Sequence, residues 1–138
     1  MRVKTRIVIV TPSREIPLRQ NMEFGRVIGK LAEQKKRKRF VFVASADQAH
    51  THAKSGPYGF SSAASRYDML VVEAIEKNRF RSIMNLDSRL VKKAKPDSLW
   101  QMAMLVGIAE EVRMKPRLLS YEVPTYYGMI CAGFERVR

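Results

Sequence analysis

The sequence is poor in cysteine and contains no long apolar run. A single cysteine among 138 residues, Cys131, excludes an internal disulfide and fits a reducing compartment, so we expect a cytoplasmic protein. Because Cys131 lies within the apolar run Met129–Ala132, we expect a buried and inert thiol. No apolar stretch approaches the roughly 20 residues needed to cross a bilayer. Ile7–Val10 is too short for the core of a signal peptide, so we expect neither a membrane span nor a secretory leader.

Acidic residues are scarce relative to basic ones. Thirteen Asp and Glu stand against 26 Lys and Arg, which leaves a net charge of +13. Such an excess is typical of proteins that bind nucleic acid or another polyanion, and an acidic partner chain would explain it equally well. The densest basic block is Lys35–Arg39, which no aromatic residue interrupts. Alternatively, this basic block is a solvated helix end, where cations complement the helix dipole.

The first 45 residues have the pattern of a βαβ unit. Runs of β-branched and other apolar residues over Arg6–Thr11 and Phe40–Ser45 predict two strands. Apolar residues at helical spacing predict a helix over Ile16–Gln34 between them. This order predicts parallel pairing with a right-handed crossover. Gly25 and Gly29 share one face of the helix, and we expect them to permit close approach to the sheet.

The rest of the chain alternates helical and strand patterns. The further predicted elements are a helix over Ser61–Lys77, two short helices over Arg79–Ala94 broken near Asp87, a nearly all-apolar helix from Pro96 to Val112, and strands over Leu118–Val123 and Tyr127–Phe134. There are no repeats or linkers. We therefore expect a single α/β domain over residues 1–138, with a mostly parallel sheet flanked by helices in a three-layer arrangement and two C-terminal strands.

Both histidines of the chain lie in one short stretch, Ser45–His52, directly after the second predicted strand. Loops at strand ends carry the chemistry of many α/β proteins, and an imidazole moves protons near neutral pH. The alternative is a surface loop that contains two histidines by coincidence. His50 and His52 stand two apart, so in an extended chain they share a face and could bind a metal together with Asp47 or Asp97.

Seven segments carry a resemblance to a known family. They are Met22–Gly29, Phe40–His50, Pro57–Phe60, Tyr67–Asp68, Asn85–Asp87, Pro96–Gly107 and Ser120–Phe134. In this order the chain resembles the C-terminal half of the catalytic (B-type) subunit of class III extradiol ring-cleavage dioxygenases, the protocatechuate 4,5-dioxygenase type. The resemblance implies O2-dependent opening of a catechol-type ring at non-haem Fe(II), which two histidines and one carboxylate hold on one face.

The resemblance also implies roles for individual residues. His50 matches the acid–base histidine that takes a proton from the substrate. Asp97 is the preferred match for the metal carboxylate, with Glu122 as the alternative. Asp97 could instead favour a helix N-terminus, and Glu122 could lie at a strand end in solvent. His52 and Tyr58 are candidates for substrate contact, with ordinary packing as the other interpretation of Tyr58.

The two histidine ligands of the family precede the first predicted strand, and no histidine precedes His50 here. Three hypotheses explain the missing histidine ligands. A second polypeptide supplies them, the natural protein is longer, or the chain has lost catalysis and is an interaction module that binds a polyanion. An incomplete sheet would leave an open edge and an uncovered apolar face. We therefore expect a homo-oligomer or a complex with the chain that supplies the histidines, beside the implied small aromatic substrate and O2.

Overall fold

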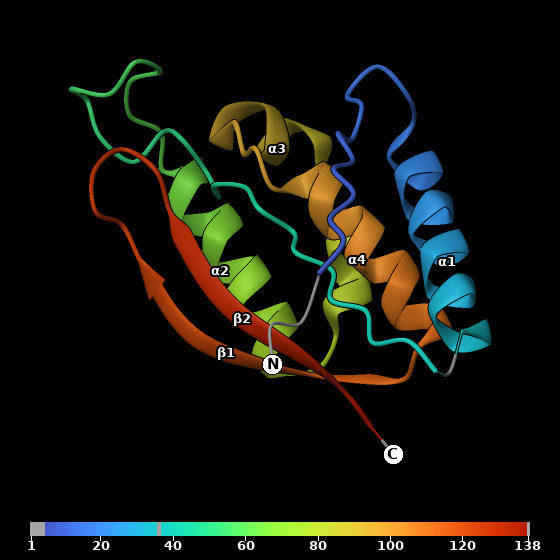
Figure 1. Cartoon of the computed structure of the whole chain (residues 1–138). Helices are drawn as coiled ribbons and strands as arrows, with labels where there is room; N and C mark the ends of the chain where they lie inside the picture. Colours follow the sequence, from blue (N-terminus) through green and yellow to red (C-terminus); the bar gives the residue numbers. More distant parts are fainter. Residues whose placement is uncertain (1–4, 36, 138) are drawn as a thin grey trace.

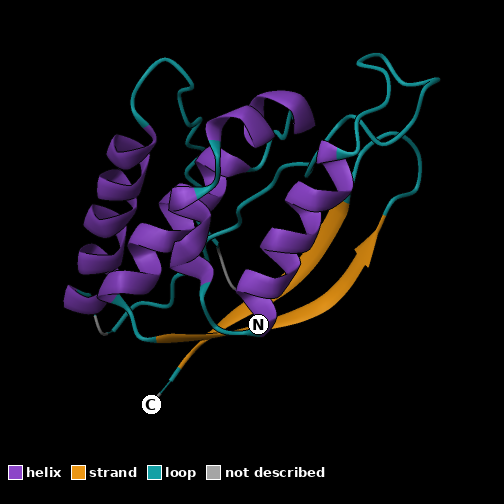
Figure 2. Ribbon diagram, turned by 180° about the vertical axis from the view of Figure 1, so that it is seen from behind, coloured by secondary structure: helices purple, strands orange, loops and turns teal. Residues whose placement is uncertain are grey.

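The computed structural model describes residues 5–35 and 37–137 as a mixed α/β chain (Figure 1). Its elements are α1 (Leu18–Gln34), α2 (Ala63–Glu76), the 3-10 helix η1 (Phe80–Asn85), α3 (Ser88–Ala94), α4 (Leu99–Glu111), β1 (Met114–Glu122) and β2 (Met129–Arg136). The two strands pair antiparallel in a single hairpin. The hairpin lies across α2, while α1 and α4 form the other end of the molecule (Figure 2). None of the helices described is long and apolar enough to cross a membrane.

The predicted helices and the two final strands are confirmed, with ends that differ by a few residues. The break near Asp87 has a local cause, because its Oδ1 accepts the Leu90 N–H at 2.8 Å and so caps the start of α3. α3 ends at Ala94 and is capped by Lys95, whose backbone is left-handed with φ of 52° and which Pro96 follows. A left-handed residue followed by proline stops a helix, so α3 is separated from α4 here.

The core lies between α2, η1, α4 and the inner face of the hairpin. Its largest fully buried apolar side chains are Tyr67, Ile83, Val71 and Val106. The predicted burial of α4 is confirmed, since Leu99, Met102, Ala103, Met104, Val106 and Ile108 are all buried. Ile130 and Ala132 of β2 pack against this core, and Cys131 between them is exposed. The prediction of a buried thiol is therefore wrong, because successive side chains of a strand face opposite sides.

Gly25 and Gly29 approach a helix, and the expectation that they approach a sheet is wrong. A Cβ on Gly25 would overlap the backbone of Met104, and one on Gly29 would crowd Ile108 and Glu111. On the facing helix, a Cβ on Gly107 would overlap the carbonyl oxygen of Met22. Because glycine has no side chain, these positions on both helices let α1 and α4 pack with their backbones nearly in contact.

The two predicted N-terminal strands, Arg6–Thr11 and Phe40–Ser45, are not formed in the described part of the chain, and neither is the mostly parallel sheet. Both segments lack strand partners among the described residues, and most of their apolar side chains face solvent: Ile9 is 89% exposed and Val41 is 88% exposed. A strand requires a neighbour for its backbone N–H and C=O groups. β-branched composition alone does not supply that neighbour.

The close contact of α1 and α4 predicts that Gly25→Ala destabilises the fold. Alanine stabilises an open helix relative to glycine, so a loss would report the clash with Met104. We expect a decrease of about 1–3 kcal/mol in the free energy of unfolding, measured by urea denaturation. Gly133→Ala is the control, since a Cβ there meets no atom within 4 Å. Unchanged stability in Gly25→Ala would contradict this packing.

Candidate functional site

The loop that carries both histidines is held in place by backbone hydrogen bonds to two separate elements. On one side, the His50 N–H donates to the carbonyl of Ala94, the last residue of α3, at 2.9 Å. On the other side, the Gln48 N–H donates to the Gly128 carbonyl at 2.9 Å, and the His52 N–H donates to the Tyr126 carbonyl at 3.1 Å. Residues 48–52 therefore lie between the end of α3 and the turn that joins β1 to β2.

The His50 ring has a defined tautomer. Its Nδ1 lies 2.9 Å from the carbonyl oxygen of Lys95. Because a carbonyl oxygen only accepts, Nδ1 must carry the hydrogen, and we assign the tautomer from this bond. The neutral ring then has its lone pair on Nε2. The left-handed backbone of Lys95 turns this carbonyl toward the loop, so the end of α3 sets the orientation of the imidazole.

Asp47 is a charged group near the free nitrogen of His50. Its Oδ2 lies 3.5 Å from Nε2. A carboxylate at this distance faces the positive charge that would appear on the ring if Nε2 took a proton from a ligand. Half of the Asp47 side chain is open to solvent, which weakens this attraction relative to a buried pair.

Three tyrosines surround the His50 ring. The ring centroids of Tyr58, Tyr126 and Tyr127 lie 5.9, 5.9 and 6.0 Å from that of His50. Tyr58 is 54% exposed, and the Lys95 Nζ lies 5.0 Å above its ring. Aromatic walls of this kind bind flat apolar ligands through stacked or edge contacts. Tyr58 thus lies beside His50, while Phe60 is exposed further along the loop.

His52 lies in a buried hydrogen-bond cluster centred on Asp68. Its Nε2–H donates to Asp68 Oδ2 at 2.7 Å, and the Tyr121 hydroxyl donates to the same oxygen at 3.0 Å. The Ala49 N–H donates to Asp68 Oδ1 at 2.9 Å. Burial raises the pKa of Asp68, and the hydrogen bonds from Ala49, His52 and Tyr121 oppose that rise. Burial, followed by the charge of Asp68, raises the pKa of the Tyr121 hydroxyl.

Asp68 was not among the site residues expected from the sequence, although a signal for it existed. It follows Tyr67 in a helix whose neighbouring positions are buried, and a carboxylate there needs partners. The side chain of His52 is nearly enclosed in this cluster. Gly128 leaves room for the Asp68 carboxylate, since a Cβ on Gly128 would overlap Asp68 Oδ2.

The two candidate metal carboxylates occupy different surroundings. The Asp97 N–H donates to the Asp47 carbonyl at 3.2 Å, which brings the start of α4 to the His50 loop. The carboxylate of Asp97 pairs with the guanidinium of Arg14, which also lies 4.6 Å above the Trp100 ring. Glu122 is exposed at the end of β1, where it pairs with Met129 across the hairpin.

The described residues do not fit a complete iron site by themselves. No group of three or more histidine, cysteine, aspartate or glutamate side chains within residues 5–35 and 37–137 could hold a metal ion. Of the two imidazoles, His52 is bound to Asp68, and the Nδ1 of His50 is bound to Lys95. Each ring thus has one nitrogen in a hydrogen bond, and the free nitrogen of His50 is Nε2, beside the carboxylate of Asp47.

Two comparisons with known proteins found matches, and one of them identifies the superfamily. A Clostridium acetobutylicum protein named "Protein CA_C1420" is 29% identical over 82 residues, which make up 59% of this chain and 18% of that protein. The chain thus spans less than two thirds of the length of this curated relative. A family model described as the catalytic LigB subunit of aromatic ring-opening dioxygenase matches residues 4–134. The chain therefore belongs to the family of the catalytic LigB subunit of aromatic ring-opening dioxygenases.

Proposed function

We propose that this chain supplies the acid–base histidine of an extradiol ring-cleavage dioxygenase that opens a catechol-type ring with O2. His50 is the residue that would do this work. The observation that carries the proposal is the hydrogen bond from its Nδ1 to the Lys95 carbonyl, which leaves Nε2 as the basic atom. A nearly enclosed imidazole with one nitrogen fixed and the other free is suited to accept and return a proton.

In this proposal the side chains of the loop divide the work. His50 Nε2 takes the proton from a ring hydroxyl, and Asp47, 3.5 Å away, stabilises the imidazolium that results. The exposed ring of Tyr58 lies against the aromatic body of the substrate and orients it. His52 contributes through Asp68, because their hydrogen bond holds the loop that carries His50.

We propose that Fe(II) belongs to this site only when a further part of the protein or a second polypeptide adds two histidines. Asp97 is the carboxylate of this chain that we place at the metal, because its backbone is bonded to Asp47 next to His50. Its carboxylate would first have to leave Arg14. Glu122 is the alternative, since the β1–β2 turn that follows it carries Tyr126 and Tyr127 beside His50.

The exposed segments Arg6–Thr11 and Phe40–Ser45 support the need for such a partner. In the second segment, Val41 and Val43 are exposed while Phe42 and Ala44 are half-buried, which is the alternation of a strand with one face covered. We propose that added strands pair with these segments and complete a mostly parallel sheet. A second copy of this chain is the alternative occupant.

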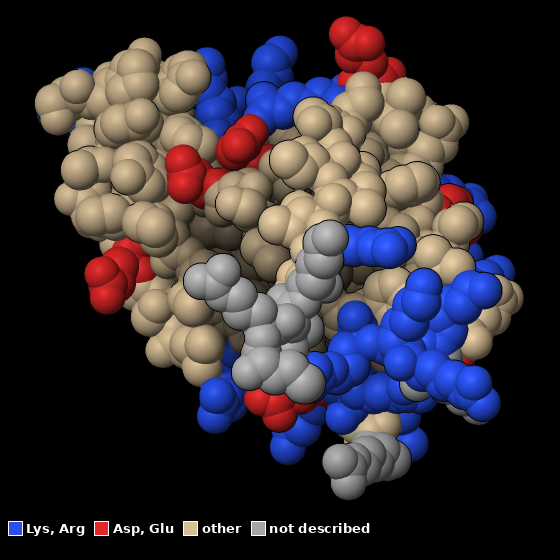
Figure 3. Space-filling model, in the orientation of Figure 1, with Lys and Arg blue, Asp and Glu red and all other residues tan. Residues whose placement is uncertain are grey.

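A second candidate function follows from the charge. Lys and Arg gather on one face of the molecule, near the C-terminal end of α1 and the beginning of β1 (Figure 3). Arg37, Lys38 and Arg39 are exposed in the segment that follows α1. This surface favours an interaction module without catalysis, which binds a polyanion such as nucleic acid.

Replacing His50 distinguishes the two functions. In the complete assembly, His50→Ala should lower kcat for cleavage of protocatechuate by at least about 100-fold, because general acid–base catalysis contributes about that much or more. Binding of a polyanion such as heparin should remain. The matched control, Arg37→Gln with Lys38→Gln and Arg39→Gln, should keep ring cleavage and lose the salt-dependent binding. Full ring cleavage by His50→Ala would contradict the role of His50.

The incomplete ligand set predicts that the chain alone does not bind Fe(II) tightly. Anaerobic calorimetry should show no stoichiometric binding to the purified chain, since its described residues contain no three-ligand group. Adding the histidine-bearing partner should produce binding, and Asp97→Ala should weaken it. Tight binding to the chain alone that disappears in Asp97→Ala would mean that this chain builds its own metal site.

The exposed strand-like segments predict association. Sedimentation at micromolar concentration should show that the chain is not a dispersed monomer. Ile9→Lys combined with Val41→Lys should shift the distribution toward monomer, because both side chains are almost fully exposed. Leu119→Lys is the control, since Leu119 is a 53% exposed apolar side chain of β1 that belongs to neither segment. A well-folded, dispersed wild-type monomer would refute this prediction.

A further inference from the structure

A groove separates α2 from α3. One part has a volume of about 420 Å³ and the adjoining part about 310 Å³. Arg66, Asp87 and Leu90 line both parts, so the two form one continuous depression, which we call the α2–α3 groove. None of the groups that contact the His50 ring lines it. The groove is therefore a different place from the candidate catalytic site.

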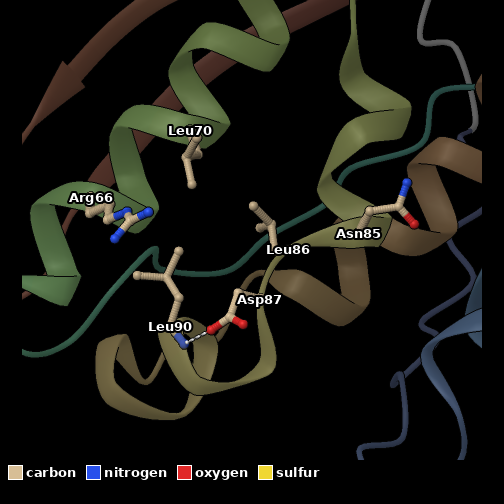
Figure 4. Close-up of a pocket in the computed structure, with 6 residues that line it drawn as sticks. All are labelled: Arg66, Leu70, Asn85, Leu86, Asp87 and Leu90. Carbon is tan, nitrogen blue, oxygen red and sulfur yellow. Dashed lines mark hydrogen bonds between the residues drawn. The ribbon is translucent and has the colours of Figure 1, made fainter.

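The larger part of the α2–α3 groove has an apolar wall. Leu70 of α2, Leu86 of the segment between η1 and α3, and Leu90 of α3 point toward a common space (Figure 4). All three leucines are partly exposed, so their side chains are open to a ligand. Covering such a surface is favourable by roughly 25 cal/mol for each Å² of apolar area removed from water.

The smaller part of the α2–α3 groove is basic. Arg66, Arg89 and Lys93 line it, together with the hydroxyl-bearing Ser61 and Ser62 before α2. Among the described residues, none of these three cations forms an ion pair, whereas Arg14, Arg26, Lys77, Arg81 and Arg136 all do. The one carboxylate in the groove, Asp87, accepts the Leu90 N–H and caps α3. Three positive charges thus face one negative charge that already has a structural partner.

We propose that the α2–α3 groove binds a small molecule that joins a carboxylate to an apolar body. The forked guanidinium groups of Arg66 and Arg89 match the two oxygens of a carboxylate, and Lys93 adds a third charge. The three leucines receive the apolar body. Because Arg66 and Leu90 belong to both parts, one ligand spans the charged and the apolar surface at once.

The ligand class is tested by NMR titration of the whole chain with three probes. Benzoate carries both a carboxylate and an apolar ring, benzyl alcohol lacks the charge, and inorganic phosphate lacks the ring. We expect benzoate to shift the methyl signals of Leu70, Leu86 and Leu90 and to bind at least about tenfold more tightly than either other probe. Phosphate that binds as tightly as benzoate would overturn the proposal, and so would equal binding of benzyl alcohol.

Charge variants then test the location. Arg66→Gln and Lys93→Gln should each weaken benzoate binding about fivefold, the effect of one partly exposed charge pair. Lys92→Gln is the matched control, because it removes the same charge from α3 at a position that does not line the groove. His50→Ala should leave benzoate binding unchanged. Equal weakening in Lys92→Gln, or loss in His50→Ala with retention in Lys93→Gln, would overturn the assignment.

Discussion

The buried carboxylate of Asp68 is the constraint on which the candidate site depends. Taking an ionised carboxylate out of water costs several kcal/mol unless donors surround it. Here three donors come from two other segments: the Ala49 N–H and the His52 imidazole from the loop, and the hydroxyl of Tyr121 from β1. Satisfying this one group therefore fixes the loop, α2 and the hairpin relative to one another. His50 lies between two of these contacts in the sequence, so its position follows from theirs.

The end of α3 supplies the second fixed point of the loop. Ala94 and Lys95 offer their carbonyls to the backbone and the ring of His50, because the helix stops there in a left-handed turn before Pro96. Helix-end carbonyls need partners of this kind. The same helix carries Arg89, Leu90 and Lys93 of the α2–α3 groove on its other turns. α3 thus connects the proposed carboxylate groove with the orientation of His50, the histidine that we propose as the acid–base residue.

Local sequence patterns predicted the helices and the C-terminal strands. The two N-terminal strands were predicted wrongly, because strand formation depends on pairing with residues far away in the sequence. Helices depend on side chains three and four residues apart, so the spacing in α1, α2 and α4 was enough to place them. The predicted strand at Phe40–Ser45 would need a distant neighbour to pair with, and its composition could not reveal that no such neighbour pairs with it in the described chain. For the site, the sequence indicated His50 and Tyr58, which the fold brings together. It gave no reason to connect His52 with Asp68, because residues 16 positions apart meet only through the tertiary fold.

The strands that we propose to add and the metal site that we propose would lie at the same place in the fold. His50 follows the extended segment Phe40–Ser45 after only four residues, so anything that pairs with that segment comes close to the candidate site. In open α/β sheets the carboxyl ends of parallel strands meet at one edge, and ligands bind there. A parallel strand added beside Val41 and Val43 would therefore end near His50 and Asp47. Histidines carried at that end would reach the carboxylates of this chain, so we infer that completing the sheet and completing the metal site are the same event.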